Sequence, residues 1–414
     1  MSELIKLVDV DKTDLLEKSS VFCMYPWTHL NATPKGDIYP CCSNDYTDPV
    51  GNTADMTLGE AINTDYMKQL RLNMLEGKQT KICNFCYNHE EASPYSFRTY
   101  SIEHFGKHFD EMIQNTHKDG TIDNFKMRYF DIRFSNICNF KCRTCGSEFS
   151  SQWAIEDKKH FKPDGPIIIH VDNEKGTVLE EILDHVDHID LAYFAGGEPL
   201  ITPEHYVIIE DLIRKGRTDT VLRYNTNASN LSYKDKDILE LWKHFDRVEV
   251  SCSIDSWGER AEVLRHGTDW GKVENNLKTL RGLDNIEFQY NTVFSIFNYL
   301  TLTEFYDYME SQNLVSYEND WYHSLYLAVH PSHYSARNLP QHMKQTAAEK
   351  IQAKFSRDDN CISRLMYDAI NFANAEHTWD THKDDFFHMT NRLNRFRNED
   401  IFAAFPELKP LEDL

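Results

Sequence analysis

In the middle of the chain, segments with the residue pattern of β-strands alternate with segments whose apolar residues recur at helical spacing. Stretches rich in β-branched and aromatic residues predict strands at 127–135, 188–195, 220–227, 247–255, 285–294 and 324–330. Segments with apolar residues at helical spacing predict helices between them, at 150–160, 177–186, 203–216, 235–245, 269–283 and 299–312. This alternation favours right-handed βαβ units around a parallel sheet. We expect an α/β fold with a partial, TIM-like (β/α)6 barrel, although a flat doubly wound sheet has the same periodicity.

The regions on either side of this alternation differ from it and from each other. Residues 1–125 contain many turn residues and five of the ten cysteines. Residues 331–414 predict helices only, and the amphipathic segment 339–355 is the clearest of them. We therefore expect three domains: a cysteine-rich domain at 1–125, the barrel at 126–330 and a helical C-terminal extension at 331–414.

Composition narrows the class of protein. Hydrophobic residues make up 41% and charged residues 27%, and the formal net charge is −22, so we expect neither broad nucleic-acid binding nor attachment to an anionic membrane. The acidic first twenty residues contain no continuous apolar segment, which argues against a secretory signal. We expect a cytoplasmic protein. Thiols stay reduced there, so the cysteines predict metal ligands better than disulfides.

Polar and glycine-rich clusters follow four consecutive predicted strands. Three cysteines follow the first strand, and Gly-Gly-Glu-Pro follows the second. Asn225 and Asn227 end the third strand, and Ser253 and Asp255 end the fourth. Parallel α/β folds place their chemistry at the carboxyl ends of the strands. The sequence therefore predicts one functional face there.

The three cysteines are Cys138, Cys142 and Cys145, with the spacing C-x3-C-x2-C. Thiolates on so tight a loop can converge on one small centre, and iron–sulfur clusters are held by short runs of this kind. Three ligands leave a coordination position open, as catalytic centres do. The alternative is a zinc site with a fourth ligand from elsewhere, such as His160.

With these motifs, residues 127 to about 330 resemble the radical S-adenosylmethionine (radical SAM) superfamily. The resemblance implies that Cys138, Cys142 and Cys145 bind a 4Fe–4S cluster whose fourth iron takes the amino and carboxylate groups of SAM. It also implies reductive cleavage of SAM to a 5′-deoxyadenosyl radical, which takes a hydrogen atom from substrate. The family often has an aromatic residue where this chain has Thr144.

The resemblance also implies a SAM pocket. In the family, the GGEP motif contacts the SAM amine, a serine in the position of Ser253 contacts SAM, and an arginine in the position of Arg265 pairs with the SAM carboxylate. Two asparagines at strand ends are candidates for the ribose hydroxyls. The implied contacts are Gly196, Gly197, Glu198, Pro199, Asn227, Ser253, Arg265 and Asn291. The alternatives are a plain strand-to-helix turn at GGEP, a solvated arginine and asparagines that cap backbone groups.

A second cysteine set lies near the N-terminus. Cys23, twelve residues, Gly36, four residues and Cys41 are followed later by Cys83-x2-Cys86. A turn with Pro34 and Gly36 between two short strands would bring the first two cysteines together. The pattern is similar to the twitch module, the short form of SPASM, and implies a four-thiolate auxiliary cluster for electron transfer or structure. Here it precedes the barrel, whereas in the family it usually follows it.

Three other cysteines have no assigned role. Cys42, beside Cys41, either replaces it as a ligand or does nothing. Cys252 and Cys361 have no cysteine neighbours, and we expect both to be buried apolar residues. A zinc ribbon remains the alternative for the N-terminal set.

The resulting hypothesis is a radical SAM enzyme with an N-terminal twitch-like domain. Resemblance to twitch and SPASM enzymes implies a peptide or protein substrate, slightly favoured over a small molecule, and an electron donor such as flavodoxin or ferredoxin. No side chain stands out as acid, base or radical relay. The competing hypotheses are a non-enzymatic zinc-binding interaction protein and an iron–sulfur electron carrier that never binds SAM.

Overall fold

The computed structural model describes residues 3–43, 46–91, 95–172, 178–317, 323–357 and 359–414. Its centre is a nine-stranded sheet with the order β13-β12-β10-β7-β6-β4-β1-β2-β3. The six strands predicted in the middle of the chain are all present and pair in parallel. They are β4 (Tyr129–Ile132), β6 (Leu191–Phe194), β7 (Val221–Thr226), β10 (Val248–Ser253), β12 (Ile286–Phe294) and β13 (His323–Leu327).

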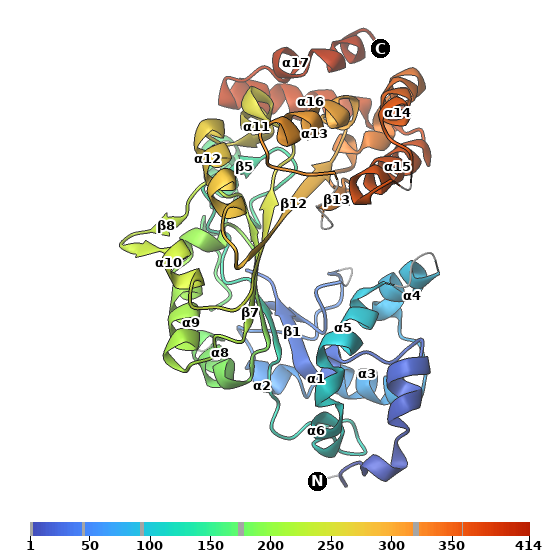
Figure 1. Cartoon of the computed structure of the whole chain (residues 1–414), viewed down its shortest axis with the longest axis vertical. Coiled ribbons are helices and arrows are strands. Elements are labelled where there is room, and N and C mark those ends of the chain that lie inside the picture. The colour runs from blue at the N-terminus through green and yellow to red at the C-terminus, as the bar shows by residue number, and fades with distance from the viewer. Residues whose placement is uncertain (1–2, 44–45, 92–94, 173–177, 318–322, 358) are drawn as a thin grey trace.

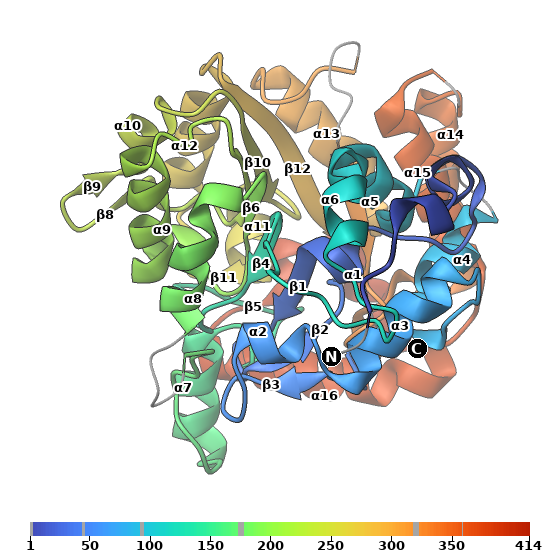
Figure 2. The same cartoon turned by 90° about the horizontal axis from the view of Figure 1, so that it is seen from below.

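The six strands lie side by side in their order along the chain. A doubly wound sheet reverses direction at a switch point, whereas a barrel is wound in one direction. The consecutive order confirms the prediction of an α/β fold with a mostly parallel, singly wound sheet. In two perpendicular views, α8, α9, α10 and α12 cover one face of this sheet, and the N-terminal helices lie on the other side (Figures 1 and 2).

Six helices of the middle region follow the predicted segments, one of them shortened, and α11 (Gly258–Leu264) is an additional helix that was not predicted. The six are α7 (Ser151–Phe161), α8 (Val178–His185), α9 (Pro203–Arg214), α10 (Ile238–Trp242), α12 (Trp270–Arg281) and α13 (Leu302–Ser311). Thr177, the first residue of one predicted helix, lies outside the described residues. The helix expected from 235 begins only at Ile238, because Lys236–Asp237 (β9) forms a small hairpin with Ser232–Tyr233 (β8).

The N-terminal region continues the same sheet. Strand β1 (His29–Ala32) pairs in parallel with β4, and β2 (Asp37–Tyr39) and β3 (Gly51–Asn52) add antiparallel strands. The predicted turn between β1 and β2 is confirmed. Gly36 there has φ +87°, and a Cβ would lie 2.4 Å from the Thr53 Oγ1, so only glycine fits. The sheet therefore crosses the predicted boundary at residue 125, and the division into three domains stays a prediction.

Helices surround the N-terminal strands and make up the C-terminal end. The first group comprises α1 (Tyr25–Thr28), α2 (Leu58–Ala61), α3 (Asp65–Leu75), α4 (Asn84–Glu90), α5 (Phe97–Phe105) and α6 (Phe109–Gln114). The second comprises α14 (Gln341–Lys354), α15 (Cys361–Asn374), α16 (Trp379–Arg397) and α17 (Ile401–Ala404). Helix α15 packs on β13, and α17 packs on α11. This confirms the helical C-terminal extension.

The two isolated cysteines differ in burial. Cys252 on β10 is fully buried, as predicted. Cys361 at the start of α15 is partly exposed, so the prediction for it is wrong, because the first turn of a surface helix leaves one side of the chain to solvent.

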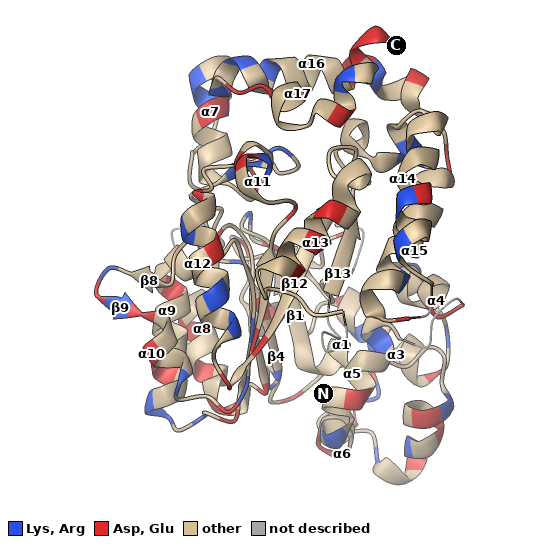
Figure 3. Ribbon diagram, turned by 45° about the horizontal axis from the view of Figure 1, so that its top comes forward, with Lys and Arg blue, Asp and Glu red and all other residues tan. Residues whose placement is uncertain are grey.

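Charged residues of both signs are scattered over the outer helices, as on α12 and α14 (Figure 3). Among the described residues, no helix combines the length and the apolarity that crossing a bilayer requires.

His205 on α9 is a buried polar residue in the core. It is 1% exposed, and its Nε2 lies 2.9 Å from the Tyr224 hydroxyl. The rings of Phe194 and Tyr206 pack edge-on against it. Burial lowers its pKa from 6.5 to about 3, because a charged imidazolium would lose its hydration there.

This depressed pKa predicts acid sensitivity. Below pH 6.5 the unfolded chain takes up a proton on His205 and the folded chain does not, so the free energy of unfolding falls as the pH falls. Between pH 7 and pH 5 the loss from this residue is about 2 kcal/mol. We expect urea unfolding of His205→Gln to show that much less pH dependence than the wild type. Identical pH dependence in the two proteins would contradict this.

Candidate active site

An open cleft of about 610 Å³ lies at the carboxyl ends of the parallel strands. A volume in this range suits a small-molecule ligand or cofactor. Eight of the residues predicted to form the site line it: Cys138, Cys142, Cys145, Gly196, Gly197, Asn227, Ser253 and Arg265. The structure thus brings together residues from four different strand ends.

The cysteine loop is held in place by neighbouring hydrogen bonds. The Cys138 N–H donates to the Ser151 hydroxyl at 3.2 Å, and the indole N–H of Trp153 donates to the Cys142 carbonyl at 2.7 Å. Cys142 also lies in a two-residue strand, β5 (Lys141–Cys142), that pairs with β11 (Arg265–His266). These contacts hold the backbone of Cys138 and Cys142 in place at the cleft.

The three thiols are poor acids where they lie. Burial raises the pKa of Cys145 to about 12 and raises the pKa of Cys138 and Cys142 as well. Each is raised further by other negative groups nearby, including neighbouring thiolates for Cys138 and Cys145. Three buried thiolates on one wall would need a cationic centre to compensate their negative charge, so the site favours binding of such a centre. The donor set fits an iron–sulfur cluster.

The glycines after β6 let the GGEP loop lie against the cysteine loop. A Cβ on Gly197 would lie 2.1 Å from the Ile137 carbonyl oxygen, and Gly196 has φ +121°. The Glu198 N–H donates to the same Ile137 oxygen at 2.8 Å. Neither glycine position tolerates a side chain, so the exposed backbone of this loop forms part of the cleft wall.

Glu198 itself is turned away from the cleft. Its carboxylate accepts hydrogen bonds from the Thr226 hydroxyl at 2.7 Å, the Asn227 N–H at 2.7 Å and the Leu200 N–H at 3.1 Å. Burial raises its pKa to about 7. These three donors fix the direction of the carboxylate, and its contact with the SAM amine stays a prediction. Its role here is to hold the Thr226-Asn227 turn.

Pro199 and Asn291 also lie outside the cleft wall. Pro199 begins a single turn, Pro199–Ile201, buried beneath the loop. The Asn291 side chain donates to the Asn225 Oδ1 at 2.8 Å. Asn225 lines the cleft in its place, although it was not among the predicted SAM contacts. Period-two alternation places both asparagines on the same face, but it does not say which is nearer the ligand.

Arg265 is fixed by Asp255. Its Nε lies 2.8 Å from Oδ2 and its Nη2 donates to Oδ1 at 2.9 Å, a two-point contact that sets the plane of the guanidinium. The Nη1 lies 3.9 Å from the Cys142 sulfur. Because the side chain is only 12% exposed, a solvated surface arginine is excluded. The positive charge is held beside the cysteine set.

All four predicted N-terminal ligands share a second cavity. Cys23, Cys41, Cys83 and Cys86 line it together with apolar side chains such as Leu70 and Phe97. Burial raises the pKa of Cys23 to about 12 and raises the pKa of Cys83 and Cys86. Four buried thiols around one cavity fit a metal centre with a complete set of protein ligands.

Comparison with family models agrees with this geometry. Residues 132–309 match the model of the Radical SAM superfamily, and residues 23–87 match the model of an iron–sulfur cluster-binding domain, SPASM. The chain therefore carries a radical SAM domain. The cofactors of such a chain are S-adenosylmethionine and a 4Fe–4S cluster, with an auxiliary iron–sulfur cluster in the SPASM domain.

Solved structures show only distant likeness to this radical SAM chain. A structure of native anSMEcpe with bound AdoMet and a Cp18Cys peptide is 18% identical over 54% of this chain and 58% of that chain, with a TM-score of 0.36. SuiB from Streptococcus suis, bound to S-adenosylmethionine, is 14% identical over 73% of this chain and 66% of that chain, with a TM-score of 0.35. The chain thus spans less than two thirds of the first of these. No curated protein sequence matches it.

The C-terminal extension supports the cysteine loop of the radical SAM domain. Arg143, between two of the predicted ligands, is 1% exposed and donates to the Glu399 carboxylate and the Asn394 side chain, each at 2.7 Å. Nearby, the Arg397 guanidinium pairs with the Glu156 carboxylate at 2.9 Å. These contacts could not be predicted from the sequence, because the partners are separated by more than 240 positions.

Proposed function

We propose that this chain cleaves SAM reductively and uses the product to take a hydrogen atom from a peptide, a protein or a small molecule. The observation that carries the proposal is the gathering of Cys138, Cys142, Cys145, Arg265 and the Gly-Gly loop in one cleft of a parallel sheet. In the proposal the three cysteines hold the 4Fe–4S cluster. When bound, the reduced cluster supplies the electron that breaks a carbon–sulfur bond of SAM.

The residues around the cysteines bind and orient the cofactor. Asp255 uses two guanidinium donors of Arg265, so the remaining donors can face the SAM carboxylate. The bare backbone at Gly196 and Gly197 allows close approach of the SAM amine. Ser253 and Asn227 offer a hydroxyl and an amide to the rest of the molecule.

We place the substrate against another part of the cleft lining. Arg133, Tyr193 and Asn225 line it, and the Asn225 side chain donates to the Tyr193 hydroxyl at 2.6 Å. Arg133 is held near Asp131, with Nε 3.7 Å from Oδ1. Fixed donors and acceptors of this kind suit the amide groups of a peptide, and we favour a peptide over a small alcohol.

For the N-terminal set we propose an auxiliary iron–sulfur cluster on Cys23, Cys41, Cys83 and Cys86. A filled four-thiolate site suits electron transfer, here from a flavodoxin or ferredoxin, better than substrate binding. The match of residues 23–87 to an iron–sulfur cluster-binding domain supports iron over zinc at this set.

We place the enzyme in the cytoplasm, since none of its ten cysteines, all of them described, forms a disulfide.

The decisive assay measures 5′-deoxyadenosine. Anaerobically reconstituted wild type is expected to bind about eight irons and to release 5′-deoxyadenosine when reduced with dithionite in the presence of SAM. Cys83→Ala should lose about half of the iron but keep measurable SAM cleavage, because its thiol lines the other cavity, while turnover of substrate falls. A colourless zinc protein without SAM cleavage would overturn the proposal in favour of a zinc-binding protein. Iron without SAM binding would favour an electron carrier.

A further inference from the structure

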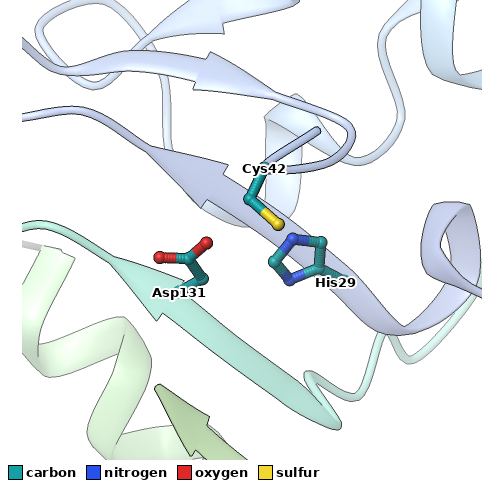
Figure 4. Close-up of side chains that lie close together, drawn as sticks. All are labelled: His29, Cys42 and Asp131. Carbon is teal, nitrogen blue, oxygen red and sulfur yellow. The ribbon is translucent and has the colours of Figure 1, made fainter. Parts of the chain in front are cut away.

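Two adjacent cysteines have different surroundings. Cys41 lines the cavity of the auxiliary set, whereas Cys42 does not. The Cys42 sulfur instead lies with His29, the first residue of β1, and Asp131 on β4. One ligand atom from each of the three residues lies within 4.8 Å of the others. In Figure 4 the sulfur, the carboxylate and one ring nitrogen of His29 point toward a common centre.

His29 is oriented as a metal ligand would be. It is fully buried, and its Nδ1 lies 3.0 Å from the Tyr129 carbonyl oxygen. A carbonyl can only accept, so Nδ1 carries the proton and Nε2 presents its lone pair. Within the described part of the chain, Nε2 has no hydrogen-bond partner. Histidines that bind metals commonly donate their other ring N–H to such a carbonyl.

Asp131 is the second reason to expect a cation. Its side chain is 0% exposed, and among the described residues neither carboxylate oxygen has a hydrogen-bond partner. The nearest cation is Arg133, whose Nε is 3.7 Å away. Burying a carboxylate without hydrogen bonds costs free energy. A metal ion between the carboxylate, the sulfur and the imidazole would offset that cost.

We propose that His29, Cys42 and Asp131 bind one divalent metal ion, and that this ion is zinc. A set of one nitrogen, one sulfur and one oxygen ligand suits zinc and is unlike the all-oxygen sites of magnesium or calcium. Three protein ligands leave a fourth position for water or a substrate group. Cys42 is only partly buried, which leaves access for the ion.

The geometry does not fit a Cys–His–Asp catalytic triad, in which the cysteine is the nucleophile. In that arrangement the carboxylate accepts from the ring nitrogen opposite the thiol. Here that nitrogen is bonded to the Tyr129 carbonyl, and the carboxylate lies on the same side of the ring as the thiol (Figure 4).

An element-specific measurement tests the proposal without interference from iron. Zinc is added to the reconstituted protein, and its content and K-edge X-ray absorption are measured. We expect one zinc per chain with one sulfur neighbour at about 2.3 Å and the others nitrogen or oxygen at about 2.0–2.2 Å. If the protein binds no zinc tightly, the zinc site is refuted, and the proposed cleavage of SAM is unaffected. Zinc with four sulfur neighbours would overturn this site and would also argue against iron in a cysteine set.

Variants locate the ion. Asp131→Asn keeps the shape of the side chain, and we expect at least about 10-fold weaker zinc binding in chelator competition, with unchanged iron content. Cys42→Ala should show the same loss, and its partly exposed side chain makes a folding defect less of a concern. Cys361→Ala is the matched control and should bind zinc as the wild type does. Wild-type affinity in either Cys42→Ala or a folded Asp131→Asn would refute the site.

Discussion

Cys142→Ala is expected to reduce 5′-deoxyadenosine formation to the background rate in the reduced, reconstituted protein. Cys142 is the central cysteine of the loop, and its sulfur lies 3.9 Å from the Arg265 guanidinium. Removing it leaves two thiols on the cleft wall, too few to hold a 4Fe–4S cluster by three of its irons. We also expect the iron content to fall by about half, because the N-terminal set is untouched.

The matched control is Cys361→Ala, which removes a partly exposed thiol on α15 and should keep both the iron and the activity. If Cys142→Ala still cleaves SAM, the cysteine loop is not the site of cleavage. If both variants lose activity with normal iron, the effect comes from the fold and not from the ligand set.

The second large effect is expected from a single methyl group at Gly197. In Gly197→Ala the new Cβ would lie 2.1 Å from the Ile137 carbonyl oxygen, which is backbone of the cysteine loop and cannot rotate away. The GGEP loop must move away from the cysteine loop, at a cost of about 1–3 kcal/mol in stability. Because both loops line the cleft, we expect SAM affinity, measured by equilibrium dialysis, to fall at least about 10-fold.

Gly59→Ala provides the comparison, since its Cβ would meet only the Thr57 Oγ1 at 3.9 Å, an ordinary contact on α2. It should bind SAM like the wild type. Wild-type SAM affinity and stability in Gly197→Ala would show that the two loops are not packed as described.

Much of the fold could be predicted because the deciding information is local. Strand and helix periods are set by neighbouring residues, and all six central strands follow them. The cysteine spacing is also local, so the loop after β4 could be identified before the structure. Gly36 is a similar case, since a tight turn with positive φ between two strands calls for glycine.

The rest depends on contacts between distant segments. The direction of the Glu198 carboxylate is set by donors at Thr226 and Asn227, on the next strand. The support for Arg143 comes from Glu399 at the other end of the chain. Cys42 acquires neighbours only when β1 pairs with β4, 100 residues later. A single sequence carries no periodic signal for any of these.

The parallel pairing of β1 with β4 has a consequence for dissecting the protein. A fragment beginning at residue 126 would carry all six strands of the barrel, yet β4 would become an edge with its N–H and C=O groups unpaired along one side. Bare edges of this kind recruit other chains and aggregate. We therefore expect residues 126–414 to aggregate when they are produced without the N-terminal region, because β1 covers this edge.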